Sequence, residues 1–167
     1  MSGLRRLGPH DRHAVTAVYR DAVLSQAPAL YSPEQVEAWA HHAERDPAVL
    51  ACLERGYGLA SLAASGGSPQ AEASIEAFGI LDPPEGQRCR LALLYCRGRS
   101  CRQGRASAIL AALESWATHQ GCRQLCTEAS QLSRPLLERR GWRLEREERL
   151  LFAGQPFLRW RMIKPLS

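Results

Sequence analysis

The chain has 167 residues, 45% of them hydrophobic, which predicts one folded domain spanning residues 1–167. No apolar run approaches the ~20 residues that a membrane-spanning helix needs. Residues 1–6 also lack the apolar segment of a secretion signal, so we expect a cytoplasmic protein with no membrane partner. The six cysteines form no CxxC pair, which favours reduced thiols over a disulfide framework or a metal site.

The net charge of +5 comes almost wholly from arginine, because Lys164 is the only lysine. Several arginines cluster in the middle of the chain, which creates a field that suits a polyanionic ligand. The cluster consists of Arg88, Arg90, Arg97, Arg99, Arg102 and Arg105. It contains no interleaved aromatic residues, and no DNA-reading motif is visible, which argues against nucleic acid as the partner.

The first half of the chain predicts one strand, three helices and then three strands. A strand over residues 4–7 precedes a helix that begins at Pro9. A second helix begins at Ser32-Pro33, a favoured cap followed by a favoured first helical residue. A third helix is predicted over residues 46–55. Strands are then predicted over residues 57–64, 74–81 and 88–96, joined by a loop over 65–70 and a turn over 82–86. These short connections predict antiparallel neighbours.

The second half predicts a strand–helix–strand unit and a closing hairpin. An amphipathic helix over residues 104–120 ends at Gly121, and a strand over 122–127 follows, parallel to the strand over 88–96. Ser133 caps a further helix that ends at Gly141. Residues 142–151 and 156–163 form a hairpin around 153–155. The sequence therefore predicts an α+β fold with a mixed, mostly antiparallel sheet and helices on both faces.

The start of the helix at residue 104 predicts an anion-binding site. The first turn of a helix has backbone N–H groups without intrahelical partners, and its dipole favours a negative ligand. Gly104 allows a phosphate to approach the backbone closely. A Rossmann fold is excluded, because there is one strand–helix–strand unit and no acidic residue at the expected distance. A P-loop is excluded because Gly-Lys-Ser/Thr is missing.

With this order of elements, the chain resembles the GCN5-related N-acetyltransferases (GNAT) over nearly its full length. Their pyrophosphate signature, Gln/Arg-x-x-Gly-x-Gly/Ala, aligns with CRQGRA at residues 101–106. Gly104 and Ala106 fit the signature, whereas Cys101 departs from it. One bacterial branch of the family has motifs that resemble residues 31–35 (YSPEQ), 127–130 (TEAS), 134–142 (RPLLERRGW) and 161–166 (RMIKPL).

The resemblance implies an acyl-CoA N-acyltransferase (GNAT) fold and an enzyme that moves an acetyl group from acetyl-CoA to a primary amine. The acceptor would be a small molecule or a peptide. The backbone of Leu94, Tyr95 and Cys96 would pair with the pantetheine arm, and Ser130 stands where many relatives bond that arm with asparagine. Loop amides would hold the pyrophosphate, with Arg99, Arg102 or Arg105 as charge partners. The loop residues are Arg102, Gln103, Gly104, Arg105, Ala106 and Ser107.

The resemblance also implies where the reaction takes place. In the family, the sheet splays between the fourth and fifth strands, and an N–H of the fourth strand, here of Cys96 or a neighbour, points at the thioester carbonyl. Glu128 is the first candidate for the general base and Glu76 is the second. Many relatives use a tyrosine four residues before the glycine at 141 as the acid. Leu137 stands there, so water or Tyr95 would protonate the thiolate.

Tyr31, Gln35 and Trp39 are expected to line or cover the acceptor pocket, although Trp39 is equally compatible with core packing. Phe157 and Trp160 of the hairpin are candidates for a homodimer surface. Two other functions stay open. A catalytically weak acyl-CoA-binding module would explain the departures at residues 101 and 137, and a nucleic-acid binder would use the arginine cluster. The sequence does not identify the acceptor.

Overall fold

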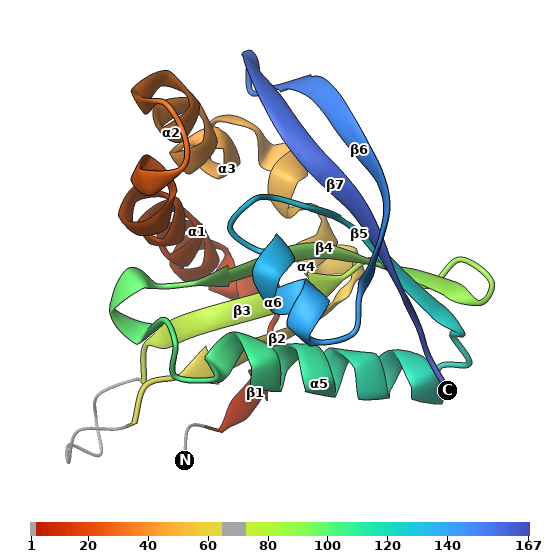
Figure 1. Cartoon of the computed structure of the whole chain (residues 1–167). Coiled ribbons are helices and arrows are strands. Elements are labelled where there is room, and N and C mark those ends of the chain that lie inside the picture. Colours follow the sequence, from red (N-terminus) through yellow and green to blue (C-terminus); the bar gives the residue numbers. More distant parts are fainter. Residues whose placement is uncertain (1–2, 65–72) are drawn as a thin grey trace.

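The computed structural model describes residues 3–64 and 73–167. One seven-stranded sheet has the order β1-β2-β3-β4-β5-β7-β6 (Figure 1). β4 and β5 are parallel, and every other neighbouring pair is antiparallel, which confirms the predicted mixed sheet. The strands are β1 (Leu4–Arg6), β2 (Tyr57–Leu62), β3 (Ile75–Leu81), β4 (Arg88–Cys96), β5 (Gln124–Ala129), β6 (Arg143–Phe152) and β7 (Gln155–Pro165).

Helices cover both faces of the sheet, as predicted (Figure 1). One face carries α1 (Arg12–Gln26), α2 (Pro33–Ala40), α3 (His42–Arg45) and α4 (Cys52–Arg55), and the other carries α5 (Arg105–His119) and α6 (Arg134–Arg139). Along the fully buried β3, Phe78 and Ile80 pack with the first group, and Ala77 and Leu81 pack with the second. In the described part of the chain, none of the helices combines the length and apolar character needed to span a bilayer.

The predicted beginning of α2 and end of α5 are confirmed. Ser32 Oγ accepts a hydrogen bond from the Gln35 N–H at 3.2 Å, and Gln35 Oε1 accepts one from the Ser32 N–H at 2.9 Å, which is a capping box. After α5, Gly121 has a φ of +86°, a left-handed conformation in which glycine is favoured. Its position lets the Cys122 N–H bond back to the Ala117 carbonyl at 3.0 Å.

Several predicted boundaries differ from those in the structure. β5 begins at Gln124 rather than 122, because the Cys122 N–H still bonds to the end of α5. The predicted helix over 46–55 is a 3₁₀ turn over Pro47–Leu50 followed by the single turn of α4, and α3 was not predicted. The strand predicted over 57–64 ends at Leu62. The loop predicted over 65–70 lies outside the described residues.

β6 and β7 form the predicted closing hairpin, and β7 lies between β5 and β6. Phe152 pairs with Gln155, and positive φ angles of 50° at Ala153 and 80° at Gly154 fit a two-residue turn. The side chain of Trp160 lies in the core with 8% of its surface exposed, and Phe157 packs in an aromatic cluster. The buried Trp160 is therefore not available to the expected dimer surface, whereas Phe157 is only partly buried.

Candidate active site

β4 and β5 separate partway along their length. Within the described residues, their parallel pairing consists of three pairs, from Arg88 with Gln124 to Arg90 with Cys126. β4 then runs on to residue 96 and β5 to residue 129 with no pair between them. A β-bulge at Ala92 shifts the register of β4 against β3 directly after this point. The edge of β4 that faces β5 is therefore open.

The open edge of β4 presents backbone hydrogen-bonding groups. The Arg97 N–H donates to the Glu76 carbonyl at 2.8 Å, and antiparallel pairs alternate between bonded and non-bonded. The N–H and C=O groups of Leu94 and Cys96 therefore point away from β3. The Cys96 carbonyl accepts a hydrogen bond from Gln26 Nε2 of α1 at 2.8 Å. The remaining groups fit an extended ligand that carries amides.

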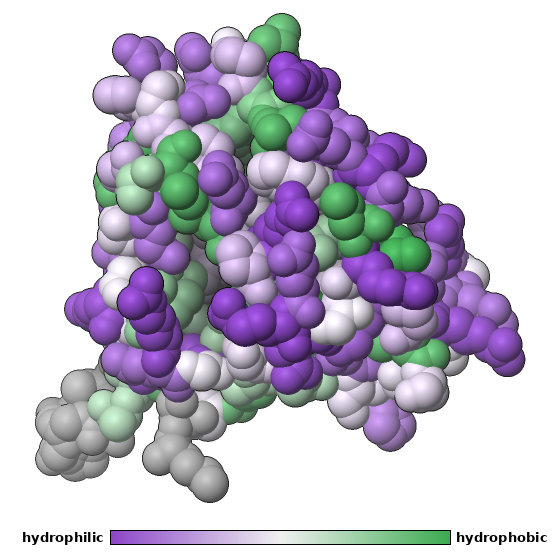
Figure 2. All heavy atoms as spheres, viewed as in Figure 1, coloured by the Kyte–Doolittle hydropathy of each residue, from purple (hydrophilic) through white to green (hydrophobic). Residues whose placement is uncertain are grey.

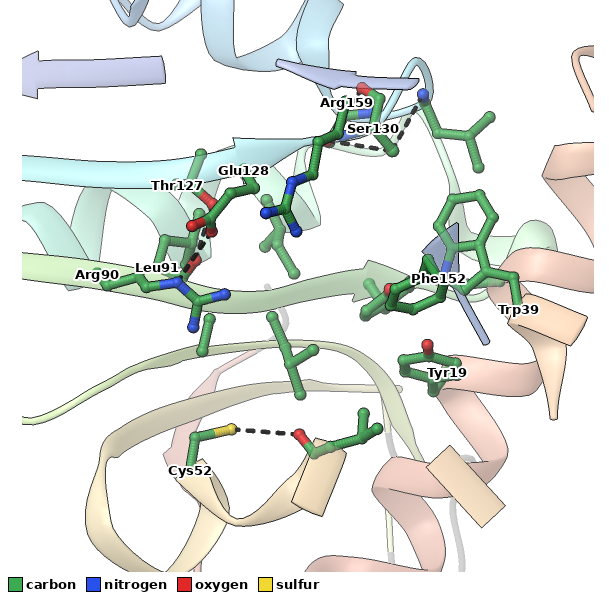
Figure 3. Close-up of a pocket in the computed structure, with 18 of the residues that line it drawn as sticks. Tyr19, Trp39, Cys52, Arg90, Leu91, Thr127, Glu128, Ser130, Phe152 and Arg159 are labelled. Atoms are coloured by element: carbon green, nitrogen blue, oxygen red, sulfur yellow. Dashed lines mark hydrogen bonds and ion pairs between the residues drawn. The ribbon is translucent and has the colours of Figure 1, made fainter. Parts of the chain in front are cut away.

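A cavity of about 480 Å³ occupies this gap and is lined from both faces of the sheet (Figure 3). Ala106 and Leu137 contribute to it from the face of α5 and α6, and Tyr19 and Trp39 contribute from the face of α1 and α2. In the space-filling view, hydrophobic residues gather near α1 and α2 and around a hollow there, within a mostly hydrophilic surface (Figure 2). Two ligands could meet in this cavity from opposite faces.

The loop before α5 presents a run of backbone N–H groups that are unpaired in the part of the chain that the structure describes. Among the described residues, no acceptor is bonded to the backbone N–H groups of residues 102–107, and the first helical bond joins the Ala108 N–H to the Gly104 carbonyl at 3.0 Å. Arg102 and Gly104 have φ angles of 61° and 79°, a conformation found in backbone anion nests. A Cβ atom at Gly104 would meet nothing within 4 Å, so the approach is open.

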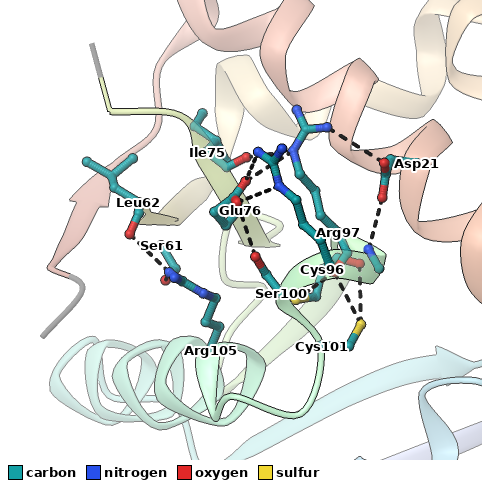
Figure 4. Close-up of polar contacts among 12 residues, drawn as sticks. Asp21, Ser61, Leu62, Ile75, Glu76, Cys96, Arg97, Ser100, Cys101 and Arg105 are labelled. Carbon is teal, nitrogen blue, oxygen red and sulfur yellow. Dashed lines mark hydrogen bonds and ion pairs between the residues drawn. The ribbon is translucent and has the colours of Figure 1, made fainter. Parts of the chain in front are cut away.

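Two of the three predicted phosphate partners have their side chains engaged elsewhere, and Figure 4 shows this for Arg105. Arg99 Nε and Nη2 donate to the carboxylate of Glu76 at 2.8 and 2.9 Å. Arg105 Nη1 donates to Ser61 Oγ of β2 at 2.9 Å. Arg102 is exposed and has no side-chain partner in the described residues, so its guanidinium is the one left for a phosphate.

Glu76, the second candidate for the base, does not line the cavity and is 4% exposed. Besides Arg99, its carboxylate accepts from Ser100 Oγ at 3.1 Å and pairs with Arg97 Nε at 3.3 Å. Burial opposes its ionisation, but the Arg99 and Ser100 hydrogen bonds and the two positive charges outweigh burial and lower the pKa of Glu76. Asp21 of α1 anchors the same loop by accepting from the backbone N–H at residue 98 at 2.9 Å.

Glu128, the first candidate for the base, does line the cavity, on the part of β5 beyond the split. Its Oε2 accepts from Arg90 Nε at 2.9 Å (Figure 3). Arg90 Nη1 also donates to Asp82 at 2.9 Å. The second oxygen, Oε1, has a 3.8 Å ion-pair contact with Arg161 Nη1 but no hydrogen bond within the described residues. That oxygen is therefore available to a ligand.

Ser130 also lines the cavity, at the end of β5. Its Oγ accepts from the N–H groups of Leu132 and Ser133, at 3.2 Å each, and its own N–H donates to Ser133 Oγ at 3.1 Å. The prediction that Ser133 caps α6 is corrected by these bonds, because the Ser133 side chain makes no cap and Ser130 satisfies the N–H groups before the helix.

The three residues expected at the acceptor pocket lie together at one end of the cavity. Tyr31 and Trp39 line it. Gln35 Nε2 donates to the Pro156 carbonyl at 2.8 Å and so joins α2 to β7. Tyr31 Oη accepts from the Gln131 N–H at 3.0 Å, which joins the same region to the segment after β5. Gln35 thus covers this end rather than lining it.

Tyr95 lies on β4, between the open edge of that strand and the residues expected at the acceptor pocket. Its Oη accepts from Trp39 Nε1 at 3.1 Å, and its ring centroid is 4.4 Å from that of Tyr19. Burial raises the pKa of Tyr95 to about 12, so the phenol is protonated at neutral pH. Sequence reasoning missed other lining residues, because no motif marks them: Tyr19, Gln26, Phe152, Phe157 and Arg159.

Solved structures of acetyltransferases share this architecture. A GCN5-related N-acetyltransferase from Rhodopseudomonas palustris matches with a TM-score of 0.82 and 21% identity, over 99% of this chain and 96% of that chain. The PaiA N-acetyltransferase from Thermoplasma acidophilum, solved with coenzyme A, matches with a TM-score of 0.74 and 15% identity, over 99% of both chains.

The ribosomal-protein-S18-alanine N-acetyltransferase from Escherichia coli matches with a TM-score of 0.68 and 18% identity, over 100% of this chain and 95% of that chain. No family model matches the sequence, and no curated protein does. The likeness in structure extends over the whole sheet and both helical layers. The chain therefore has the acyl-CoA N-acyltransferase fold, the fold of the GCN5-related N-acetyltransferases.

Proposed function

We propose that the protein is an N-acetyltransferase that moves an acetyl group from acetyl-CoA to a primary amine. The observation that carries this proposal is the cavity through the split between β4 and β5, which connects an anion-binding loop with an aromatic pocket on the opposite face. The likeness to solved N-acetyltransferases, one of them with coenzyme A bound, supports it.

The residues at the loop and the strand edge fit acetyl-CoA. The free N–H groups of residues 102–107 would hold its pyrophosphate, with Arg102 as a charge partner. The open groups of Leu94 and Cys96 would bond the amides of its arm, and Ser130 faces the same cavity. Acetyl-CoA supplies the acetyl group as an activated thioester.

The transfer forms one C–N bond, breaks one C–S bond and moves a proton from the amine to the leaving thiolate. In our proposal Glu128 takes the amine proton, directly or through water, because its Oε1 accepts no hydrogen bond from the described residues. The N–H of Leu94 or Cys96 polarises the thioester carbonyl. Leu137 only fills the wall, so in our proposal water protonates the thiolate. The raised pKa of Tyr95 keeps its phenol protonated but makes it a weaker acid than an ordinary thiol.

The test measures thiol release and acetylated product by mass spectrometry with acetyl-CoA and a panel of primary amines. We expect Glu128→Gln to lower kcat about 100-fold, the usual contribution of a positioned base, with little change in the KM of acetyl-CoA. The control is Glu147→Gln, which removes an exposed carboxylate of β6 that has no ion pair in the described residues. A Glu128→Gln variant with full kcat would remove Glu128 from the mechanism.

The same experiment separates the alternatives that the sequence leaves open. Acetyl-CoA that raises the melting temperature without any transfer would identify an acyl-CoA-binding module, which Cys101 and Leu137 would explain. Acetyl-CoA that neither binds nor stabilises the protein would contradict the proposed function. Salt-sensitive binding to DNA or RNA would then favour a nucleic-acid binder.

A further inference from the structure

We propose that the acceptor is a small monoamine that carries both an aromatic or other bulky apolar group and a carboxylate, and that Arg159 selects the carboxylate. This inference rests on the proposed function and specifies its second substrate. Three observations carry it: an aromatic wall, a restricted space and an excess of positive charge in the cavity.

The aromatic wall lies at the end of the cavity near α1 and α2. Six rings line it, and neighbouring ring centroids lie between 4.4 and 6.5 Å apart. Such a surface binds a flat or bulky apolar group at low entropic cost. The rings belong to Tyr19, Tyr31, Trp39, Tyr95, Phe152 and Phe157.

The segments around this end are tied together, and the volume of the whole cavity is limited. The Gln35–Pro156 and Tyr31–Gln131 hydrogen bonds tie α2, β7 and the segment after β5 around the aromatic rings. The cavity of about 480 Å³ also has to admit the end of the cofactor arm. This volume suits an acceptor of a few ring and chain atoms better than the folded surface of a protein.

The charged residues that line the cavity are three arginines and two carboxylates. Arg90 bonds both carboxylates, at 2.9 Å each, and offsets part of their negative charge, so that these five side chains together carry one net positive charge. An acceptor with several positive charges would meet an excess of positive charge here, whereas an acceptor with one carboxylate would balance it. The residues are Arg55, Arg90, Arg159, Asp82 and Glu128.

Arg159 is the cation best placed to bind that carboxylate. Figure 3 shows its guanidinium pointing into the cavity, between Glu128 and the aromatic group that includes Phe152. Its Nε donates to Glu148 Oε2 at 2.7 Å, which orients the side chain, while its two terminal nitrogens have no partner in the described residues. A guanidinium presented in this way matches the two oxygens of a carboxylate.

L-Phenylalanine and phenethylamine are the matched probes, because they differ by the carboxylate alone. The transfer to either amine forms one C–N bond, breaks the C–S bond of acetyl-CoA and moves the amine proton to the leaving thiolate. We expect the wild-type protein to have a higher kcat/KM for phenylalanine than for phenethylamine. Arg159→Gln should lower the ratio of these two kcat/KM values about 10- to 100-fold, which is the usual contribution of a charge-assisted hydrogen bond. Comparing the ratio between variants cancels the different basicity of the two amines. Arg159→Lys should keep part of the preference.

The matched control is Arg146→Gln, which removes the other arginine bonded to Glu148, at 3.0 Å, from outside the cavity. It should leave the ratio unchanged. A ratio that Arg159→Gln does not alter, or a wild-type preference for spermidine over phenylalanine, would overturn the inference. Acetylation of other amines but neither probe would overturn it and leave the proposed function intact. Acetylation of no amine at all would contradict the proposed function itself.

Discussion

At the scale of single residues, Glu76 shows how a carboxylate near a site differs from one within it. The sequence places Glu76 on a strand beside the predicted site, which made it a candidate base. Its partner Arg99 lies 23 residues further on, and only the folded loop brings the two together. The same loop contains Arg97 and Ser100, so the carboxylate positions the backbone that leads into the residues proposed to bind the pyrophosphate.

We therefore predict that Glu76→Gln raises the KM of acetyl-CoA about tenfold with little change in kcat, because the loop loses its anchor. It should also lower the free energy of unfolding by about 2 kcal/mol, since the charge-assisted hydrogen bonds of a buried carboxylate are lost. Glu85→Gln, at an exposed turn, is the control. An unchanged KM would show that the loop does not depend on Glu76.

The same carboxylate predicts a dependence of stability on pH. Because the folded pKa of Glu76 lies below its ordinary value of 4.5, ionisation stabilises the folded state above that pH. This contribution is lost as the pH falls through the lower folded pKa. The difference in unfolding free energy between wild type and Glu76→Gln should be largest near pH 7 and shrink below about pH 4.5, which urea titrations at each pH would measure.

At the scale of elements, local sequence patterns predicted the features that depend only on residues close together in the chain. The capping residues of α2, the glycine after α5 and the loop at its start follow from spacing and residue type alone. The single turns between α2 and β2 were not predictable in this way, because pieces of four residues have little periodicity of their own and are held by packing against the sheet.

The two ends of α5 allow a matched test of the anion loop. Gly104 and Gly121 both have left-handed φ angles, and neither has an atom within 4 Å of an added Cβ. Alanine at either position should cost a similar strain of about 1 kcal/mol. Calorimetry should find that Gly104→Ala weakens acetyl-CoA binding about tenfold, because the backbone conformation that exposes the N–H groups is penalised, whereas Gly121→Ala does not. Equal affinities would contradict a backbone-held phosphate.

At the scale of the whole molecule, the site depends on contacts between distant segments that no local pattern encodes. The Gln35–Pro156 bond joins residues 121 apart, and the Tyr31–Gln131 bond joins residues 100 apart. The resemblance pointed to Tyr31, Trp39 and Glu128, which the fold does bring to one cavity. It did not point to Phe152 or Arg159, because their positions follow from β7 lying between β5 and β6.

The C-terminal motifs that carry part of the resemblance have a structural explanation in a buried network around Glu114. This residue of α5 is 9% exposed and accepts hydrogen bonds from Arg140 Nη2 at 3.2 Å, Trp142 Nε1 at 3.3 Å and Lys164 Nζ at 2.9 Å. The network ties the middle of α5 to the end of α6 and the end of β7, across the layer that bounds the cavity. The single lysine thus neutralises a buried carboxylate.

Removing this carboxylate should therefore destabilise the whole fold. We predict that Glu114→Gln lowers the free energy of unfolding by about 3 kcal/mol, because two cations lose their partner in a buried setting. For a domain of this size, that loss lowers the melting temperature by about 6–12 °C. Glu138→Gln, which breaks an exposed pair on α6, should cost less than about 1 kcal/mol. The double variant Glu114→Leu/Lys164→Met should recover part of the loss, since apolar replacement removes both buried charges. Equal melting temperatures for Glu114→Gln and Glu138→Gln would show that the network contributes no more than a surface pair.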